Sequence, residues 1–412
     1  MPVRRQWSLA LLLVLLSPSS WAAKKVDLDY HVQLLPQSDQ AEVRVTLAEG
    51  SAVRSLNFDL GTESRYSDFS ADGHWQLTPA NGEQDARGLW QPGSGKSSLS
   101  YRVRISQVRK SGSFDTRMTP TWALMRGEDL VPPARLDQQD GIELVARLEF
   151  QLPAGWKSVE TAWPRIGKQR FRIDNVSRLF DRPTGWMLAG NLGSRRTRLG
   201  ETEVSVVAPQ GQALHRMDVL TLLTFVWPKV QEVFPRNPPK LLVVGAGDPL
   251  WRGSLAAHDS IYLHSGRPLV NESGSSPLVR ELVHVFGRIS GRQHSDWIGE
   301  GLAEYYAIEL VRRAGGMSEE RYRNLQLRLT HSSRKVTTLR GDQVSGATVA
   351  RAVLLLQELD REIRQQTRDQ RSLDDVSRAL MRLDRVTTRE FVQLAESVIG
   401  GPSKVLASKL LQ

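Results

Sequence analysis

Side chains that bind metals and move protons gather in one part of this 412-residue sequence. Glu281 and His284 are three positions apart, and Glu300 follows after fifteen intervening residues. Arg280 directly precedes Glu281. Imidazole nitrogens and carboxylate oxygens are common ligands of divalent metals, and a carboxylate can also take a proton from a bound water. These four residues are therefore the first candidates for an active site.

The spacing of these residues is that of an incomplete zinc motif. In the HExxH motif, two histidines four residues apart reach one zinc ion, and the glutamate after the first acts on the bound water. Here Arg280 takes the place of the first histidine. A guanidinium stays protonated and has no lone pair for a metal. It would also repel a divalent ion roughly 4 Å away by about 8 kcal/mol at an effective dielectric of about 20. Metal-assisted hydrolysis is therefore disfavoured.

Two helices are predicted to position these side chains, because apolar residues recur at helical spacing around them. Ser275 or Ser276 can cap the first helix. We expect that helix to end at Gly291 or just before it. The second helix begins near Trp297 and places two glutamates one turn apart.

Further motifs connect the sequence to a known family. Residues 297–306 read WIGEGLAEYY, which fits the W-x-x-E-G start of a helix that supplies a third, carboxylate ligand. Residues 346–364 and 372–376 match the helical tail of the same enzymes. On these grounds the sequence resembles the glycyl aminopeptidases, which are gluzincins, and more distantly the alanyl aminopeptidases. Both are thermolysin-like metallopeptidases, so the resemblance implies their fold.

The resemblance implies a role for each matched residue. His284 corresponds to the second zinc ligand, Glu300 to the third ligand, and Glu281 to the general base. Arg280 stands at the first-ligand position. We hypothesise that Arg280 substitutes internally for the metal, with its guanidinium holding Glu281 and Glu300 and joining the two helices.

Two other parts of the family's machinery differ from the pattern. The strand segment that helps to hold the substrate amine has its nearest equivalent at residues 253–258, which contain no glutamate. The segment that would carry a transition-state tyrosine corresponds to residues 343–347, which contain none. Zinc therefore stays a candidate cofactor, but the altered residues favour a chain without one.

Three more side chains are candidates for the cleft. Glu304, one turn after Glu300, is expected to support a ligand or to lie at the surface. His258 belongs to the segment that would line the cleft. His294, in the loop between the two helices, is expected to be an exposed loop residue at the edge of the cleft, and the alternative is that it moves in to replace the lost ligand.

The start of the chain has the order of a secretory signal. Arg4 and Arg5 precede an apolar run at residues 9–16, and small residues come before Ala23. We expect residues 1–22 to be a signal peptide and the protein to be exported to the periplasm or outside the cell. No later stretch is long and apolar enough to predict a transmembrane segment.

The rest of the chain predicts a multidomain α+β protein. Residues 23–208 alternate as strands do and predict an antiparallel β-sandwich. Residues 209–316 predict a thermolysin-like mixed domain, with a helix at 213–234 and a loop at 251–260. Residues 317–412 predict a helical domain.

Composition limits the partners. The chain has no cysteine, so disulfides and thiolate ligands are excluded. The net charge of +10 is spread along the chain, which suits weak binding to anionic surfaces. No nucleic-acid-binding module is evident.

Three functions follow as alternatives. The preferred one is an exported, catalytically degenerate relative of the glycyl aminopeptidases, a pseudoenzyme that binds a peptide or protein partner through the inherited cleft or the β domain. The second is an active zinc aminopeptidase with an unusual ligand set, such as His284, Glu300 and His294 or a water. The third is a structural scaffold of the cell envelope.

Overall fold

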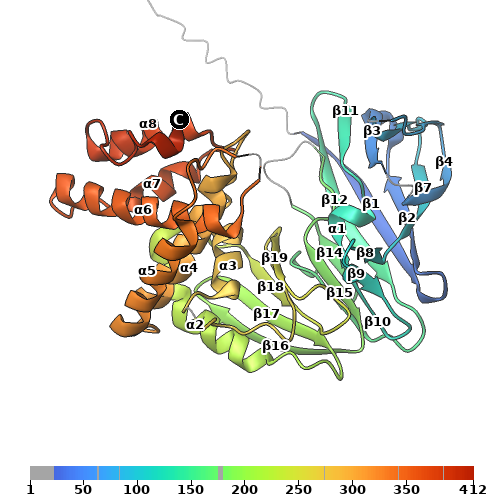
Figure 1. Cartoon of the computed structure of the whole chain (residues 1–412). Helices are drawn as coiled ribbons and strands as arrows, with labels where there is room; N and C mark the ends of the chain where they lie inside the picture. The colour runs from blue at the N-terminus through green and yellow to red at the C-terminus, as the bar shows by residue number, and fades with distance from the viewer. Residues whose placement is uncertain are drawn as a thin grey trace, which may run out of the picture.

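The computed structural model describes residues 23–62, 65–82, 84–174, 180–272, 274–341, 343–383 and 385–412. The predicted signal peptide at residues 1–22 lies outside the described residues. A sheet-rich N-terminal part, a middle sheet with helices packed against it, and a helical C-terminal part follow one another (Figure 1). The predicted α+β class is confirmed.

Two sheets enclose the N-terminal core. Their strands are β1 (Lys24–Leu35), β2 (Gln40–Leu47), β3 (Val53–Gly61), β4 (Tyr66–Ala71), β5 (His74–Thr78), β6 (Ala86–Gln91), β7 (Ser97–Arg104), β11 (Ala134–Gln138), β12 (Ile142–Gln151) and β14 (Arg170–Arg172). The orders are β14-β12-β1-β2-β7-β4 and β11-β3-β6-β5. Alternate residues of β1 are buried from Val26 to Leu34, because successive side chains of a strand point to opposite faces. Tyr30, Phe58 and Trp90 of the two sheets share one apolar cluster.

A third sheet joins this core to the middle of the molecule. It contains β8 (Gln107–Val108), β9 (Phe114–Met118), β10 (Trp122–Arg126), β13 (Ser158–Glu160) and β15 (Trp186–Gly190), and the short helix α1 (Gly127–Leu130) follows β10. Its order is β13-β15-β10-β9-β8. Met187 belongs to the N-terminal core, whereas its neighbour Trp186 packs in a cluster with Leu242 of the middle sheet. The third sheet is therefore buried on both faces.

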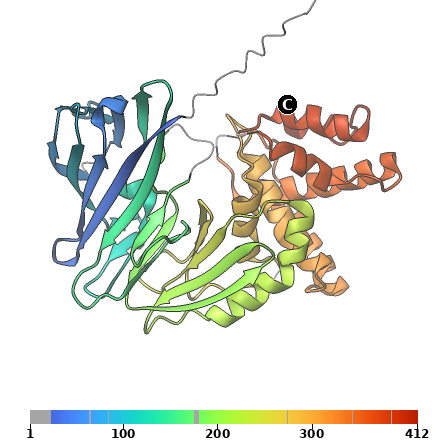
Figure 2. The ribbon, with the colours of Figure 1, turned by 180° about the vertical axis from the view of Figure 1, so that it is seen from behind.

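The middle sheet carries one wall of the candidate site. Its strands are β16 (Leu192–Leu199), β17 (Thr202–Pro209), β18 (Lys240–Val244), β19 (Ser254–Ala257) and β20 (Ser260–Leu263). Helix α2 (Arg216–Val233) connects β17 to β18. The order is β16-β17-β18-β20-β19, with β17, β18 and β20 parallel and β19 antiparallel at one edge. Helix α2 lies along this sheet (Figure 2).

The strand pairing differs from the prediction in three places. The N-terminal sandwich was expected to be antiparallel, but β1 and β12 pair in parallel. The middle sheet begins at Leu192, the first residue of β16, because β16 pairs with β17 and β17 pairs with β18. The predicted division at residue 208 therefore falls within a strand of this sheet. The predicted loop at residues 251–260 is wrong in part, because Ser254–Ala257 pairs with β20 as an edge strand.

Six helices complete the described chain after β20. They are α3 (Pro277–Gly287), α4 (Asp296–Arg313), α5 (Glu319–Ser333), α6 (Gly346–Thr367), α7 (Leu373–Leu380) and α8 (Thr388–Ile399), and short 3₁₀ turns lie at Pro36–Ser38, Gly50–Ala52 and Lys409–Leu411. Ser276 caps α3 through the amide of Val279. Helix α3 ends four residues before the predicted Gly291, because Arg288 adopts the left-handed conformation with φ of 50°.

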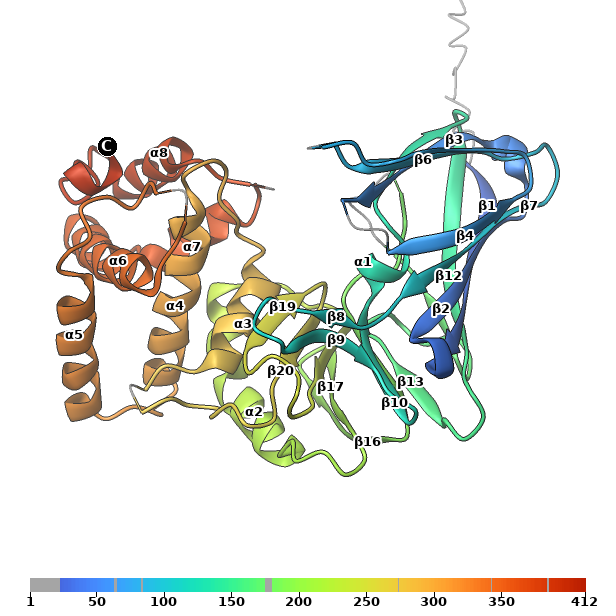
Figure 3. The same cartoon turned by 45° about the vertical axis from the view of Figure 1, so that its right-hand side comes forward.

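The helices α3 to α8 pack around the largest apolar cluster (Figure 3). Gly301 in the WIGEGLAEYY segment brings α4 close to α6, since a Cβ atom at this position would lie 2.8 Å from Cβ of Ala352. Close packing against α6 therefore holds α4, the helix that carries Glu300, in place. Across the described residues, no helix combines the length and apolar character needed to cross a membrane.

Candidate active site between α3, α4 and β19

A cavity of about 950 Å³ lies where α3, the start of α4 and the edge strand β19 meet. It collects five of the seven predicted site residues. The residues that line it are Ala162, Trp163, Pro164, Arg172, Asp174, Arg236, Asn237, Pro238, Pro239, Trp251, Ser254, Leu255, Ala256, Ala257, His258, Asp259, Arg280, Glu281, His284, Val285, Arg288 and Glu300. Residues 162–174 come from the N-terminal part, which therefore closes one side of the cavity.

The Arg280 guanidinium bridges the two site helices. Its Nη2 donates a hydrogen bond to Oε2 of Glu300 on α4, and its Nη1 donates to Oε1 of Glu281 at 3.3 Å. Its Nε lies 3.6 Å from Oε2 of Glu304. The Arg280 side chain is 27% exposed, so these charges are partly shielded from water. One cation thus contacts three carboxylates.

Glu281 is held in place from two sides. Besides Arg280, its carboxylate accepts hydrogen bonds from Oγ of Ser254 at 3.1 Å and from the backbone N–H of Ala256 at 2.8 Å. Its side chain is 3% exposed. Burial raises the pKa of Glu281, while the charge of Arg280 and the bonds from β19 act in the opposite direction. Both carboxylate oxygens already have protein donors, whereas a general base needs an oxygen directed at its substrate.

His284 lies next to Glu300 without a close hydrogen bond. Its Nε2 is 3.8 Å from Oε1 of Glu300, beyond hydrogen-bonding distance. Burial lowers the pKa of His284, the nearby Arg280 charge lowers it further, and the Glu300 charge opposes both. This environment favours the neutral imidazole.

The side chains at this position do not fit a zinc ion. A catalytic zinc site takes three protein ligands. His284 and Glu300 offer two donors, and the Arg280 guanidinium, which has no lone pair, contacts the Glu300 carboxylate. Over the ranges that the structure describes, no group of three His, Cys, Asp or Glu side chains is placed to hold a metal.

The remaining two histidines have different positions. His258 lines the cavity and stacks on Trp163, with ring centroids 4.5 Å apart and an angle of 17° between the planes. His294 is absent from the lining and faces a second cavity instead. The α3–α4 loop that carries His294 is attached to the segment preceding α8, because the backbone N–H of Arg292 donates a hydrogen bond to the carbonyl of Val386 at 2.8 Å. The expectation that His294 reaches the cleft is corrected.

Sequence reasoning missed two groups of site residues. Ser254 and Ala256 hold Glu281, but the segment that carries them was expected to be a loop. Asp259, at the turn between β19 and β20, accepts bonds from Arg236 at 2.6 Å and from Arg288 at 3.2 Å. Residues 253–258 were matched to the strand that helps to hold the substrate amine in the family, although they contain no glutamate. That match was the signal in the sequence that could have predicted β19.

Comparison with solved structures identifies the fold. An aminopeptidase N family protein from Idiomarina loihiensis superposes with a TM-score of 0.65 over 92% of this chain and 72% of its own, at 14% identity. An M1 zinc metallopeptidase from Deinococcus radiodurans, in a mutant bound to a Tyr-Ser-Ala substrate, gives 0.56 over 94% and 92%, at 14% identity. A two-domain M1 zinc metallopeptidase mutant bound to L-tryptophan gives 0.59 over 94% and 93%, at 13% identity.

The sequence itself gives no such match. Neither the models of known protein families nor the curated proteins match it. At 13–14% identity, the structural likeness establishes that this chain has the fold of the M1 zinc metallopeptidases. The predicted metallopeptidase fold is confirmed at that level.

Proposed function

We propose that this protein is an exported, catalytically degenerate relative of the glycyl aminopeptidases that binds a peptide or a protein partner in its cleft. The proposal rests on one observation above all. Arg280 lies between α3 and α4 with its guanidinium on Glu281 and Glu300, and so occupies the space between the residues that would hold a metal. The export part rests on the order of residues 1–22.

Two further features support a loss of catalysis rather than a changed ligand set. Glu281, the candidate base, is already bonded to β19 as well as to Arg280. The Ala256 amide on the cleft side of β19 is committed to that carboxylate. A peptide could pair with this amide only by displacing Glu281. The ligand is therefore expected to contact the cavity walls and not to extend the sheet at this point.

The cavity is large enough for a short peptide. Its volume of about 950 Å³ is at the upper end of the range for small-molecule sites. The stacked rings of Trp163 and His258 give it an aromatic wall, and Arg288 and Asp259 give it charged groups at one side. Such a mixture suits a ligand with both apolar and polar groups.

Metal content and hydrolysis test the degenerate state. The mature protein, dialysed against zinc and then against buffer, is expected to retain far less than one zinc per chain by elemental analysis. It should leave Tyr-Ser-Ala and amino-acid anilides intact. Stoichiometric zinc, together with hydrolysis that disappears in Glu281→Gln, would refute the proposal. Hydrolysis that is unchanged in Glu281→Gln would come from a contaminating enzyme and would leave the proposal standing.

Peptide binding tests the role of the cleft. Calorimetry with Tyr-Ser-Ala, the ligand of the Deinococcus enzyme, is expected to give binding that Ala257→Trp weakens about tenfold or more, because the indole would fill the cavity that Ala257 lines. Ala80→Trp, at an exposed position, is the matched control and should bind as the parent does. Equal affinities of all three proteins would place the peptide outside the cleft and contradict this assignment.

A further inference from the structure

A second cavity, of about 860 Å³, lies between the α3–α4 loop, the start of α8 and the C-terminal segment. Its lining comes from distant parts of the sequence. The lining residues are Arg292, Gln293, His294, Ser295, Arg340, Arg385, Thr387, Thr388, Arg389, Val392, Gln393, Leu406, Ala407, Ser408, Leu411 and Gln412. Four of them are arginines, and none is an aspartate or a glutamate.

These arginines form no close ion pairs among the described residues, although bonds from Thr387 and, after them, the charge of Arg292 lower the pKa of the neighbouring Glu390. Within the described ranges, no ion pair within 4 Å joins Arg292, Arg340, Arg385 or Arg389 to an acidic group. Arg385 does donate hydrogen bonds through Nε at 3.2 Å and Nη2 at 3.0 Å, but its acceptor is the neutral carbonyl of Gly291. The cavity therefore keeps an excess of positive charge. The site between α3 and α4 differs, because each arginine there faces a carboxylate.

The floor of this cavity is a fixed structure and not a loose surface. Ser295, at the N-terminus of α4, and Thr388, in the first turn of α8, are 2% and 7% exposed. The Thr388 amide donates to Oγ of Ser295 at 2.9 Å, and the Trp297 indole donates to Oγ1 of Thr388 at 3.1 Å. The α3–α4 loop is further anchored at Val386. The arginines thus extend from a frame that holds them around a common space.

We propose that this cavity is a binding site for a ligand with several phosphate groups. Guanidinium groups bind phosphate oxygens through paired, charge-assisted hydrogen bonds, and hydroxyl groups add neutral donors. Ser408 supplies such a hydroxyl at the rim. A soluble polyphosphate and a phosphorylated lipid headgroup share this chemistry.

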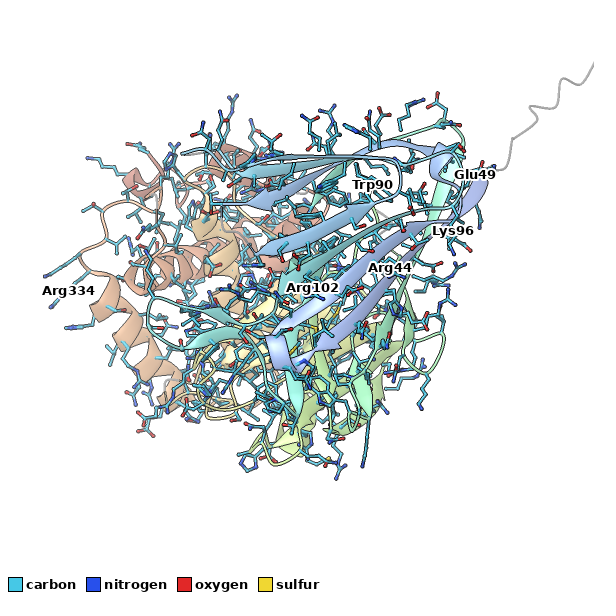
Figure 4. The ribbon with its side chains drawn as sticks, turned by 90° about the vertical axis from the view of Figure 1, so that its right-hand side faces the viewer. Arg44, Glu49, Trp90, Lys96, Arg102 and Arg334 are labelled. Carbon is cyan, nitrogen blue, oxygen red and sulfur yellow. The ribbon has the colours of Figure 1, made fainter. Side chains whose placement is uncertain are left out.

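The test uses two probes on the mature protein. Tripolyphosphate binding is measured by calorimetry at low and at physiological salt. Vesicles of phosphatidylcholine, with or without diphosphoryl lipid A, whose headgroup carries two phosphates, are used in co-sedimentation. The variant Arg340→Gln/Arg389→Gln removes two exposed guanidinium groups from the cavity. The matched control Arg44→Gln/Arg102→Gln removes two charges from the distant N-terminal sheet, where the side chains are 55% and 45% exposed (Figure 4).

The expected result is tripolyphosphate binding that weakens as salt increases and that the cavity variant reduces about tenfold or more. The control should change it by less than about twofold, since remote exposed charges are screened. Binding of anionic vesicles alone, lost in the cavity variant, would identify a lipid headgroup as the source of the phosphate. Equal losses in the two variants, or no binding of either probe, would overturn the proposal. Unchanged melting temperatures of both variants show that the fold is intact.

Discussion

Replacing Arg280 by histidine should give this protein a zinc site. The variant would restore two imidazoles four residues apart on α3, which is the spacing that lets both reach one ion. The third ligand is already near. Nε2 of His284 lies 3.8 Å from Oε1 of Glu300. Two ligands of a tetrahedral zinc ion, each about 2.0–2.1 Å from the metal, are about 3.4 Å apart. Side-chain rotation can close the difference.

The gain in affinity follows from the charge that is removed. A guanidinium roughly 4 Å from a divalent ion costs about 8 kcal/mol at an effective dielectric of about 20. Solvent screens part of this, since the Arg280 side chain is 27% exposed. If about half remains, removing the charge alone strengthens zinc binding by about a thousandfold. The new imidazole adds to that gain.

Elemental analysis after equilibrium dialysis gives the stoichiometry, and the visible spectrum of the cobalt-substituted variant reports tetrahedral coordination. We expect one metal per chain in Arg280→His. Arg236→His is the matched control, because it puts an imidazole in the same cavity without the four-residue spacing to His284. Stoichiometric zinc in the unaltered protein would refute the reasoning about Arg280. A folded Arg280→His variant with no more zinc than Arg236→His would refute the inherited geometry.

Two further predictions concern stability. Arg280→Met leaves the buried Glu281 carboxylate without its cation and should lower the free energy of unfolding by about 3 kcal/mol, near the low end for a broken buried pair. Arg280→Met/Glu281→Gln should recover most of this in calorimetric scans, and equal losses in both variants would contradict the argument. The second prediction concerns His264, which is 4% exposed and whose pKa burial lowers. In the unfolded chain the histidine has a pKa of about 6.5, so it binds a proton more readily there than in the folded protein. The free energy of unfolding is therefore unaffected by protonation of His264 above about pH 6.5 and decreases as the pH falls below that value. His264→Asn, which keeps an acceptor for the Gly266 amide, should show a smaller fall in melting temperature between about pH 7 and 5.5; an identical fall would contradict it.

Local patterns predicted the helices and their caps well. Ser372 and Thr387 cap α7 and α8, and each forms a capping box, with Asp375 and Glu390 as the reciprocal partners. The start of α4 near Trp297 is confirmed as well. These features depend on residues within one or two turns of each other, which is why a single sequence reveals them.

Features that depend on distant pairing were not predictable in the same way. β19 is a strand because β20 pairs with it, and its short Ser, Leu and Ala sequence carries no clear alternation. The hydrogen bonds from Ser254 and Ala256 to Glu281 follow from that pairing. The arginine-lined cavity was missed because residues 292, 340 and 385–389 meet only in the folded chain. By contrast, Arg280 was expected to reach both Glu281 and Glu300, and its contacts agree.

The bridge from Arg280 to α4 also has a consequence for where such a protein can work. In a zinc enzyme, the cation between two helices comes from the surroundings, so its occupancy depends on metal supply and on competing chelators. The cation between α3 and α4 is a side chain of the protein itself. Its local concentration is fixed by the covalent chain, and starvation for zinc cannot deplete it. This link between the two helices should therefore be as complete in a metal-poor medium as in a metal-rich one.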